Sequence, residues 1–197
     1  MSGRLPLLGA ILAAAAGLWL VGSGGWIHAK AMLASQLIER AWDQRLAGAE
    51  RPRPWPWADT WPVARLNFPK QNRLITVLAG AQGATLAFGP GHLTGAATPG
   101  APGNAIIAGH RDTSFRFFGA LSPGDPVRLQ SANGKWKTYR VTGRMIVDTR
   151  QSWSPPEPGP DSSMLTLVTC WPLDAIIPGG PERLLIFAEE DPPGAPA

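Results

Sequence analysis

The chain contains little of several residue types on which small proteins often depend. Its 197 residues include one cysteine, which excludes an intramolecular disulfide and a zinc site built from several cysteines. Only 16% of the residues are charged, and the 18 Lys and Arg form no run of five or six, so nucleic-acid binding is not expected despite a net charge of +4. Because 23 glycines and 21 prolines interrupt the chain, a helical bundle is also disfavoured. A β-rich domain with many turns fits this composition.

One long hydrophobic run is present, at the N-terminus. Residues 5–27 form a stretch of 23 residues without a charge, which is long enough to cross the hydrocarbon core of a bilayer. We expect a retained single-pass signal-anchor in the inner membrane, with residues 1–4 cytoplasmic and the following domain on the periplasmic side. A cleaved signal peptide is the alternative, because the run is rich in Ala and Gly. Basic residues lie on both sides of the run, so a count of Lys and Arg does not favour an inside N-terminus.

Residues 28–61 are expected to connect this run to the domain. Over 29–47, apolar side chains recur every three or four residues, which predicts an amphipathic helix, continuous with the membrane segment or just past it. Over 48–62, four prolines alternate with tryptophans, which predicts a stiff, extended connector. The tryptophans of this connector are expected to pack on the domain and not at a lipid interface; they are Trp55, Trp57 and Trp61.

Residues 62–190 have the pattern of a single all-β domain, and residues 191–197 are expected to be a flexible tail. Short apolar or alternating runs separated by turn residues predict a closed barrel or a sandwich of seven or eight strands. The expected strands are 64–68, 74–78, 84–88, 104–108, 127–131, 136–148, 163–169 and 183–189. Gly143 interrupts the longest of these runs and predicts a β-bulge, whereas residues 113–121 predict a short helix or a turn of helix.

Three polar or reactive residues stand at the ends of predicted strands. His110 follows the run NAIIAG, Cys170 follows SMLTLVT, and Arg183 opens RLLIFAE. A lone cysteine in an apolar run is most often a small buried side chain. In an exported domain, however, a free thiol is unusual, and this one ends its strand directly before a loop. A thiolate nucleophile, a histidine that moves protons and an arginine that donates to an oxyanion would together perform acyl transfer.

The motifs around these residues resemble the sortase family. TLVTC (Thr166–Cys170) matches the family's TLxTC signature, GHR (Gly109–Arg111) matches its catalytic-histidine motif, and Arg183 stands where the essential arginine opens the next strand. The segments AGHRDTSF, TLVTCWP and PGGPERL look like the Gram-negative branch, the marine proteobacterial or class GN sortases. The resemblance covers residues 62–189. It implies a sortase-type closed β-barrel of about eight strands with short helices, preceded by an N-terminal membrane helix.

The resemblance also implies a function, that of a membrane-anchored cysteine transpeptidase. Such an enzyme would cleave a C-terminal LPxTG-like sorting signal on an exported protein, hold the product as a thioacyl intermediate on Cys170, and pass it to an amine or to water. His110 and Arg183 would complete the catalytic set in a monomer, with no metal and no cofactor. The groove around them is expected to contain six further residues: His92, Asp112, Thr113, Thr169, Trp171 and Pro172. Asp112 has a second interpretation, as the N-cap of the helix predicted over 113–121.

Two other classes of protein are compatible with a lone cysteine and a histidine. L,D-transpeptidases also pair these residues, but their nucleophile lies in the motif S-x-G-C-[IV]-R, which the sequence lacks. The alternative outside the enzymes is a membrane-anchored β-barrel binding module with a non-catalytic buried cysteine. That alternative predicts that Cys170 does not react with thiol reagents.

Overall fold

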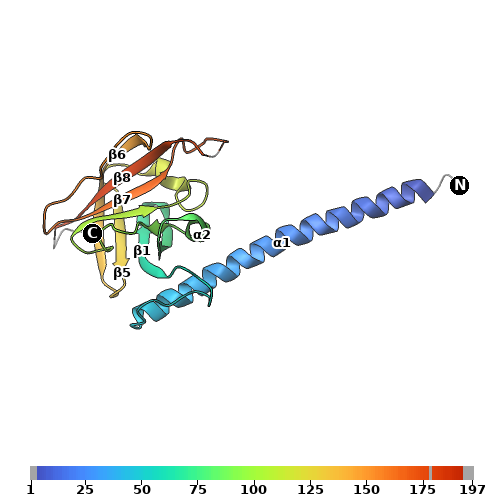
Figure 1. Ribbon diagram of the computed structural model, residues 1–197, viewed down its shortest axis with the longest axis horizontal. Coiled ribbons are helices and arrows are strands. Elements are labelled where there is room, and N and C mark those ends of the chain that lie inside the picture. Colours follow the sequence, from blue (N-terminus) through green and yellow to red (C-terminus); the bar gives the residue numbers. More distant parts are fainter. Residues whose placement is uncertain (1–3, 178, 193–197) are drawn as a thin grey trace. The chain divides into compact units, whose positions relative to one another are not determined.

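The computed structural model describes residues 4–177 and 179–192, which fall into two units, Met1–Leu37 and Ile38–Ala197. The long helix α1 (Arg4–Leu46) begins in the first unit and ends in the second (Figure 1). In the first unit, its large apolar side chains are exposed; they include Leu12, Leu18, Trp19, Leu20, Val21 and Trp26. The stretch from Leu12 to Leu46 is long and apolar enough to cross a membrane, with a mean hydropathy of 1.2. The helix is therefore a candidate membrane anchor, and the helix predicted over 29–47 is its continuous C-terminal part.

In the second unit, the last turns of α1 pack against the wall of a β-barrel. Trp42 is fully buried, and the guanidinium of Arg65 lies over its ring, 5.5 Å from the centroid. Arg65 also forms an ion pair with Glu39. The second carboxylate oxygen of Glu39 accepts a hydrogen bond from the Thr76 hydroxyl at 2.6 Å. An aromatic side chain and a small polar network thus hold this end of the helix in place.

The connector after α1 packs on the same unit through two of its three tryptophans. The rings of Trp55 and Phe88 meet edge to face, with centroids 4.8 Å apart. Trp61 is half-buried, and its carbonyl accepts a hydrogen bond from the Ala79 N–H at 2.8 Å. Trp57 is 80% exposed. The prediction that these side chains pack on the domain is therefore confirmed for Trp55 and Trp61 and wrong for Trp57.

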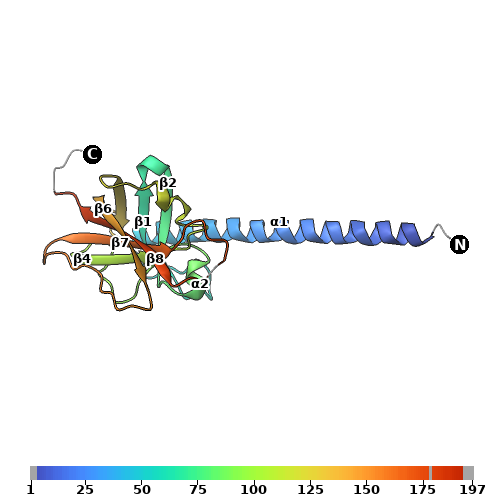
Figure 2. The same ribbon diagram turned by 90° about the horizontal axis from the view of Figure 1, so that it is seen from above.

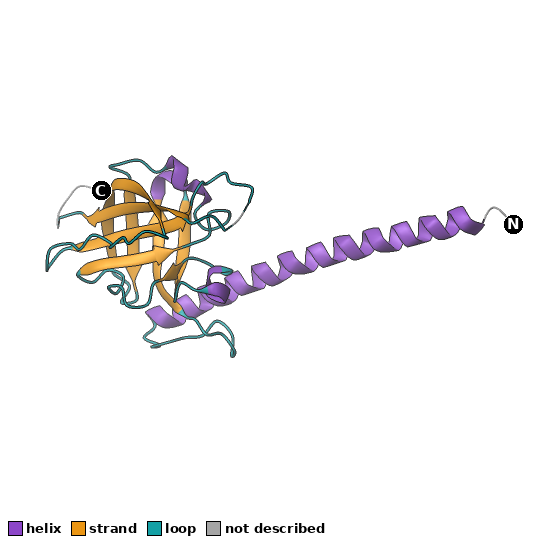
Figure 3. Ribbon diagram, turned by 45° about the horizontal axis from the view of Figure 1, so that its top comes forward, coloured by secondary structure: helices purple, strands orange, loops and turns teal. Residues whose placement is uncertain are grey.

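The strands of the described residues close into a barrel (Figure 3). The eight strands follow one another in the order β1-β2-β3-β4-β7-β8-β6-β5. Their bounds are β1 (Pro62–Phe68), β2 (Arg73–Ala79), β3 (Gly91–His92), β4 (Gly103–Ala108), β5 (Pro126–Ser131), β6 (Trp136–Asp148), β7 (Ser163–Cys170) and β8 (Glu182–Glu190). Short helices lie between them: η1 (Pro69–Gln71), α2 (Gly83–Leu86) and η2 (Arg116–Ala120). The closed barrel is confirmed, and the sandwich alternative is wrong. Closure pairs the strand edges that an open sheet would leave exposed.

Side chains that alternate along the strands fill the barrel interior. The core includes Leu66 and Phe68 of β1, and the rings of Phe115 and Phe118 stack in it with centroids 4.0 Å apart. Tyr139 is fully buried, and its hydroxyl lies 2.7 Å from that of Ser163. Burial raises the pKa of Tyr139 to about 12. Each large apolar side chain buried in this way stabilises the fold by about 1.5–3 kcal/mol.

The strand predictions need correction in two places. The segment 84–88, expected to be a strand, overlaps helix α2 instead. The two-residue strand β3 was not predicted, because it is defined by its pairing with β2 and β4 and is too short to show a pattern. Gly91 is needed in it, since a Cβ there would collide with the carbonyl oxygen of Gly80.

The short helix or helical turn expected over 113–121 is confirmed as a turn followed by the short helix η2. Phe115 occupies its N-cap position without a capping side chain, so the interpretation of Asp112 as an N-cap is wrong. The carboxylate of Asp112 accepts a hydrogen bond from the Arg111 guanidinium at 3.3 Å. By contrast, the bulge predicted at Gly143 is confirmed by a register shift between Val141 and Gly143.

Candidate active site

The strand register brings the three predicted catalytic residues to one edge of the barrel. Strands β4 and β7 are parallel neighbours (Figure 2). Ala108 lies opposite Val168, and His110 and Cys170 each lie two residues further along. Strands β7 and β8 are antiparallel, with Cys170 directly opposite Arg183. Histidine, cysteine and arginine therefore come from three adjacent elements. Because paired strands lie about 4.7–4.9 Å apart, the backbone is close together at these positions.

The three side chains differ in exposure, but none is fully buried. His110 is exposed, and Cys170 is a free, half-buried thiol at the last position of β7. Arg183 is half-buried, and its Nη1 donates hydrogen bonds of 2.7 Å to the carbonyls of Gly180 and Glu182. These bonds hold one nitrogen of the guanidinium against the loop that precedes β8. All three side chains are therefore at least partly open to solvent at this edge of the barrel.

The outer face of β4 and β7 beside Cys170 carries apolar side chains of modest size. Ile107 and Leu167 point into the core, so strand alternation directs their neighbours outward. Ile106, Ala108 and Val168 are accordingly half-buried on the same face as Cys170. This face offers an apolar floor along which an extended peptide could lie.

The long loop between β6 and β7 covers the far end of this face. Asn104 holds the loop, because its amide donates to the carbonyl of Pro156 at 2.9 Å. The amide oxygen of Asn104 in turn accepts from the hydroxyl of buried Thr166 at 2.9 Å. Between the loop and β4 is a hollow of about 530 Å³, lined by Asn104, Ile106 and the proline-rich stretch 154–160.

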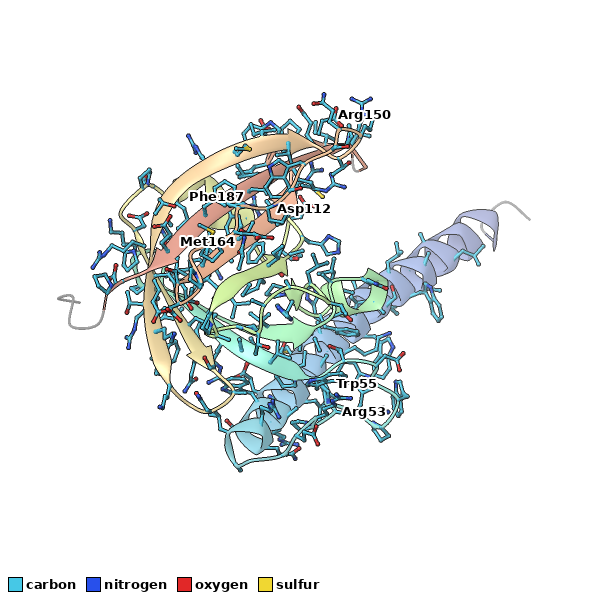
Figure 4. The ribbon with its side chains drawn as sticks, turned by 60° about the vertical axis from the view of Figure 1, so that its left-hand side comes forward. Arg53, Trp55, Asp112, Arg150, Met164 and Phe187 are labelled. Carbon is cyan, nitrogen blue, oxygen red and sulfur yellow. The ribbon has the colours of Figure 1, made fainter. Side chains whose placement is uncertain are left out.

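A second hollow under the same loop lies over β7 and β8. Met164 and Phe187 line it together with Trp153 of the loop, and Figure 4 shows these first two side chains on neighbouring strands. The loop therefore borders two hollows on the outer face.

Thr169 does not line the outer face, contrary to the sequence-based expectation. Its side chain is buried, and its hydroxyl donates to the carbonyl of Gly109 at 2.8 Å. The Gly109 N–H donates to the carbonyl of Val168 at 3.0 Å. A Cβ at position 109 would lie 2.6 Å from the ring of Phe115, so only glycine allows this close approach. Thr169 thus joins the end of β7 to the residue before His110.

Four other predicted groove residues lie in the two loops that leave this edge. Asp112 (labelled in Figure 4) and Thr113 follow His110 and are exposed. Trp171 and Pro172 follow Cys170; Pro172 is exposed, whereas Trp171 packs partly against the core. The Trp171 N–H donates to the carbonyl of Glu182 at 3.0 Å, which closes the base of the loop between β7 and β8.

His92 belongs to a different part of the barrel. It lies on β3 opposite Ile107, and its Nε2 is 2.9 Å from the carbonyl oxygen of Ala97. It lines a hollow of about 400 Å³ with residues such as Arg45 and Ser131, and Cys170 is not among the lining residues. Burial lowers the pKa of His92. The structure therefore does not bring His92 to the edge occupied by Cys170.

Arg111 was not among the predicted site residues and was noted only as the third residue of the GHR motif. In the structure, its guanidinium is buried beside the site. Arg111 is 6% exposed and donates to the carbonyls of Pro172 at 2.8 Å and Ala175 at 2.7 Å. Its position next to a candidate catalytic histidine could have indicated a role at the site. The burial of Arg111 could not be predicted from the sequence. No group of three His, Cys, Asp or Glu side chains among the described residues could hold a metal ion.

A closed β-barrel with a half-buried thiol at the end of a strand fits the class of enzymes with a cysteine nucleophile. Comparison with known proteins identifies the family. The model of the Sortase domain family matches residues 66–191. Sortase D from Bacillus subtilis (strain 168) is 32% identical over 124 residues, which cover 63% of this chain and only 61% of that protein. The chain belongs to the sortase family, a family of cysteine transpeptidases.

Solved structures agree with this assignment. Sortase C-1 from Actinomyces oris is 27% identical, with a TM-score of 0.58 over 66% of this chain and 75% of that one. Sortase A from Corynebacterium diphtheriae is 22% identical, with a TM-score of 0.59 over 81% of this chain and 84% of that one. At that lower identity, the second likeness supports the fold alone.

Proposed function

We propose that this protein is a membrane-anchored cysteine transpeptidase that cleaves a C-terminal LPxTG-like sorting signal and transfers the product to an amine or to water. The observation that carries the proposal is the strand register, with Cys170 opposite Arg183 and in step with His110 across parallel strands. In this proposal, Cys170 is the nucleophile, Arg183 the oxyanion donor and His110 the acid/base group.

In the first half of the reaction, the Cys170 thiolate attacks the carbonyl carbon of the threonine in the signal. The carbonyl oxygen becomes an oxyanion, which the Arg183 guanidinium stabilises by donating hydrogen bonds. The carbon–nitrogen bond then breaks as protonated His110 gives a proton to the leaving amine. The product is a thioester on Cys170, and the released amine carries the rest of the signal.

In the second half, an incoming amine or a water molecule attacks the thioester carbon. Neutral His110 accepts the proton that the nucleophile loses, and Arg183 again stabilises the oxyanion. The carbon–sulfur bond breaks and regenerates the thiolate. When the nucleophile is an amine, one amide bond replaces another, so the exchange needs no external energy source.

The outer face of the barrel fits the apolar part of such a signal. Ile106, Ala108 and Val168 provide apolar surface next to Cys170, and the loop held by Asn104 bounds it. A leucine–proline pair offers mainly apolar surface and a fixed backbone bend, which a shallow apolar floor with a stiff wall accommodates. We infer that this pair lies on the β4–β7 face and that the threonine carbonyl reaches Cys170.

The N-terminal helix supports a tethered enzyme. The exposed apolar side chains between Leu12 and Ile27 suit a single-pass anchor. We infer that this anchor lies in the inner membrane, with a monomeric catalytic domain on the periplasmic side. A substrate held in the same membrane would reach the site at a high effective concentration. The motif segments around His110, Cys170 and Arg183 favour the Gram-negative, class GN branch of the family.

The proposal is tested by mass spectrometry of the full-length protein in detergent, incubated with LPxTG-containing peptides. We expect an added mass equal to the peptide up to its threonine, attached to Cys170 and absent from a Cys170→Ala variant. A generic thiol reagent provides the comparison. If the reagent labels Cys170 readily but no peptide forms an adduct, this substrate class is wrong. If Cys170 resists both, the non-catalytic binding module is the better interpretation; the half-burial of Cys170 argues against it.

A further inference from the structure

We propose that Arg111 is a positioning residue that holds the loop between Cys170 and Arg183 in the conformation needed for catalysis. The catalytic part of this inference rests on the proposed transpeptidase function, whereas the structural part does not. Arg111 directly follows His110 in the chain, so the same peptide segment carries the acid/base group and the loop contact.

The contacts of Arg111 are directed at backbone carbonyls of that loop. Its Nη1 donates to Pro172 O at 2.8 Å, and its Nη2 donates to Ala175 O at 2.7 Å and, more weakly, to Ile177 O at 3.5 Å. The Ala175 N–H donates to the same Pro172 carbonyl at 3.3 Å, which closes a turn. The planar guanidinium therefore spans both ends of this turn, which a single ammonium group cannot do.

The burial of Arg111 makes these bonds necessary. Its side chain is 7% exposed, and its carboxylate partner, Asp112, is 3.3 Å away and 73% exposed. A buried guanidinium without close partners would be strongly unfavourable, so the loop carbonyls compensate for its lost hydration. The dependence is mutual, because without Arg111 these carbonyls would lose their charged donor.

Side-chain packing does not hold this part of the loop. Ile176 is 97% exposed and Ile177 is 81% exposed, although Leu173 packs against the core. The backbone around the two isoleucines is therefore fixed through its carbonyls. Arg111 is the side chain that binds them.

The other half of the loop is held from the opposite side. Arg183 donates to the carbonyls of Gly180 and Glu182, and Thr149 donates to Pro181 through both its N–H and its hydroxyl, at 3.0 and 2.8 Å. The loop is thus fastened by Arg111 near Cys170 and by Arg183 and Thr149 near β8. Loss of the first contact would free the segment that follows the nucleophile while leaving β7 and β8 paired.

The experiment compares Arg111→Gln and Arg111→Lys in the full-length protein in detergent, with Arg116→Gln as the matched control. Arg116 is an exposed arginine in the same His110-to-β5 connection. Hydrogen exchange measures the amides of residues 173–177, thermal unfolding measures the whole domain, and peptide cleavage gives kcat and KM.

For Arg111→Gln, we expect exchange at 173–177 to accelerate by at least about tenfold, with exchange in β1, β2 and β6 unchanged. The value of kcat should fall by about tenfold or more while KM changes by less than about twofold, because the geometry around the thiol is lost and the apolar floor is not. Arg111→Lys keeps the charge but should restore little, and Arg116→Gln should match the wild type.

Two results would overturn the proposal. In one, exchange at 173–177 is the same in all variants. In the other, exchange rises throughout the barrel in both Arg111 variants, which would make Arg111 a general stabilising residue. A wild-type protein that cleaves no peptide would refute the proposed function, and the exchange measurement would still decide whether Arg111 holds the loop.

Discussion

Two sides of the same barrel are built differently. At the β4–β7–β8 edge, His110, Cys170 and Arg183 remain wholly or partly exposed. At the β1–β2 wall, Trp42 and Arg65 belong to a closed cluster of an aromatic ring, an ion pair and hydrogen bonds that fastens the end of α1.

The difference shows two uses of polar side chains, one for reaction with a substrate and one for holding an element in place. A group that must react with a substrate has to keep contact with the outside, so it contributes little to stability. A group that fastens an element is surrounded by partners, and its removal leaves those partners unsatisfied. We therefore expect substitutions at the edge to change turnover and not stability, and substitutions at the wall to do the opposite.

The largest effect is expected for Cys170→Ala, which removes the nucleophile. Peptide cleavage and adduct formation should be abolished, because no other thiol is present in the chain. The free energy of unfolding, measured by urea titration, should change by less than about 1 kcal/mol because the side chain is half-buried and loses one atom. Residual thioester formation, or collapse of the fold, would contradict the comparison of the two sides.

Arg183→Lys is expected to lower kcat by about 10²-fold or more, because an ammonium cannot reproduce the planar donor set at the oxyanion. Its control is Arg144→Lys, an exposed arginine on the neighbouring strand β6. Steady-state kinetics with the same peptide measures both. Near-normal turnover in Arg183→Lys would remove Arg183 from the mechanism.

On the β1–β2 wall, Trp42→Ala is expected to lower the free energy of unfolding by about 3–5 kcal/mol, as large aromatic truncations in cores do. The intact fraction should keep normal kcat. Trp42→Phe is the matched variant. It should cost much less, because it keeps most of the buried ring and removes an indole N–H that has no hydrogen-bond partner among the described residues. Loss of kcat in folded Trp42→Ala would show that the two sides are coupled.

Asp125 gives a pH-dependent test near the same wall. Its buried carboxylate accepts from Lys70 at 2.5 Å and from the Ser122 N–H at 2.9 Å, and these contacts lower the pKa of Asp125. A lowered pKa in the folded state stabilises the protein above the ordinary carboxylate value of about 3.9. That contribution is lost as the pH falls through the lowered pKa. Asp125→Asn should therefore unfold more easily than wild type at pH 7, and the difference should shrink in acid. A difference independent of pH would rule out this charge as the cause.

The smallest effect is expected for Glu39→Gln. Glu39 is half-exposed, so its ion pair with Arg65 should contribute about 0.2–1 kcal/mol and less at high salt. Glu157→Gln, at an exposed position in the loop between β6 and β7, is the control. Urea titrations at low and high salt measure the difference. A salt-independent loss several times larger would mean that Glu39 acts mainly through Thr76.

Much of the fold could be predicted because it depends on local patterns. Seven of the eight strands were predicted to within two residues at either end, and the bulge at Gly143 followed from a glycine in an alternating run. The failures occurred where the local pattern was ambiguous. Residues 84–88 are apolar and short, so periodicity could not separate strand from helix. Strand β3 has two residues and exists only because β2 and β4 lie on either side of it.

At the candidate site, residue type and position were predictable, but side-chain direction was less so. Thr169 is adjacent to Cys170, and strand alternation turns it inward to bond Gly109. His92 and His110 both follow glycine in similar-looking segments, yet His92 lies on β3 opposite Ile107 of β4, whereas His110 follows the end of β4. The role of Arg111 depends on three carbonyls more than 60 positions away, which no local pattern could indicate.

The sequence by itself determined which parts of the chain are apolar, which form strands, and which side chains carry reactive groups, because composition and periodicity act over a few neighbouring residues. Only the tertiary structure decided which of those groups meet. The parallel pairing of β4 with β7 sets His110 in step with Cys170, and the antiparallel pairing of β7 with β8 sets Cys170 opposite Arg183. The buried face of each strand determines these registers, because a shift by one residue would turn that strand's core side chains outward.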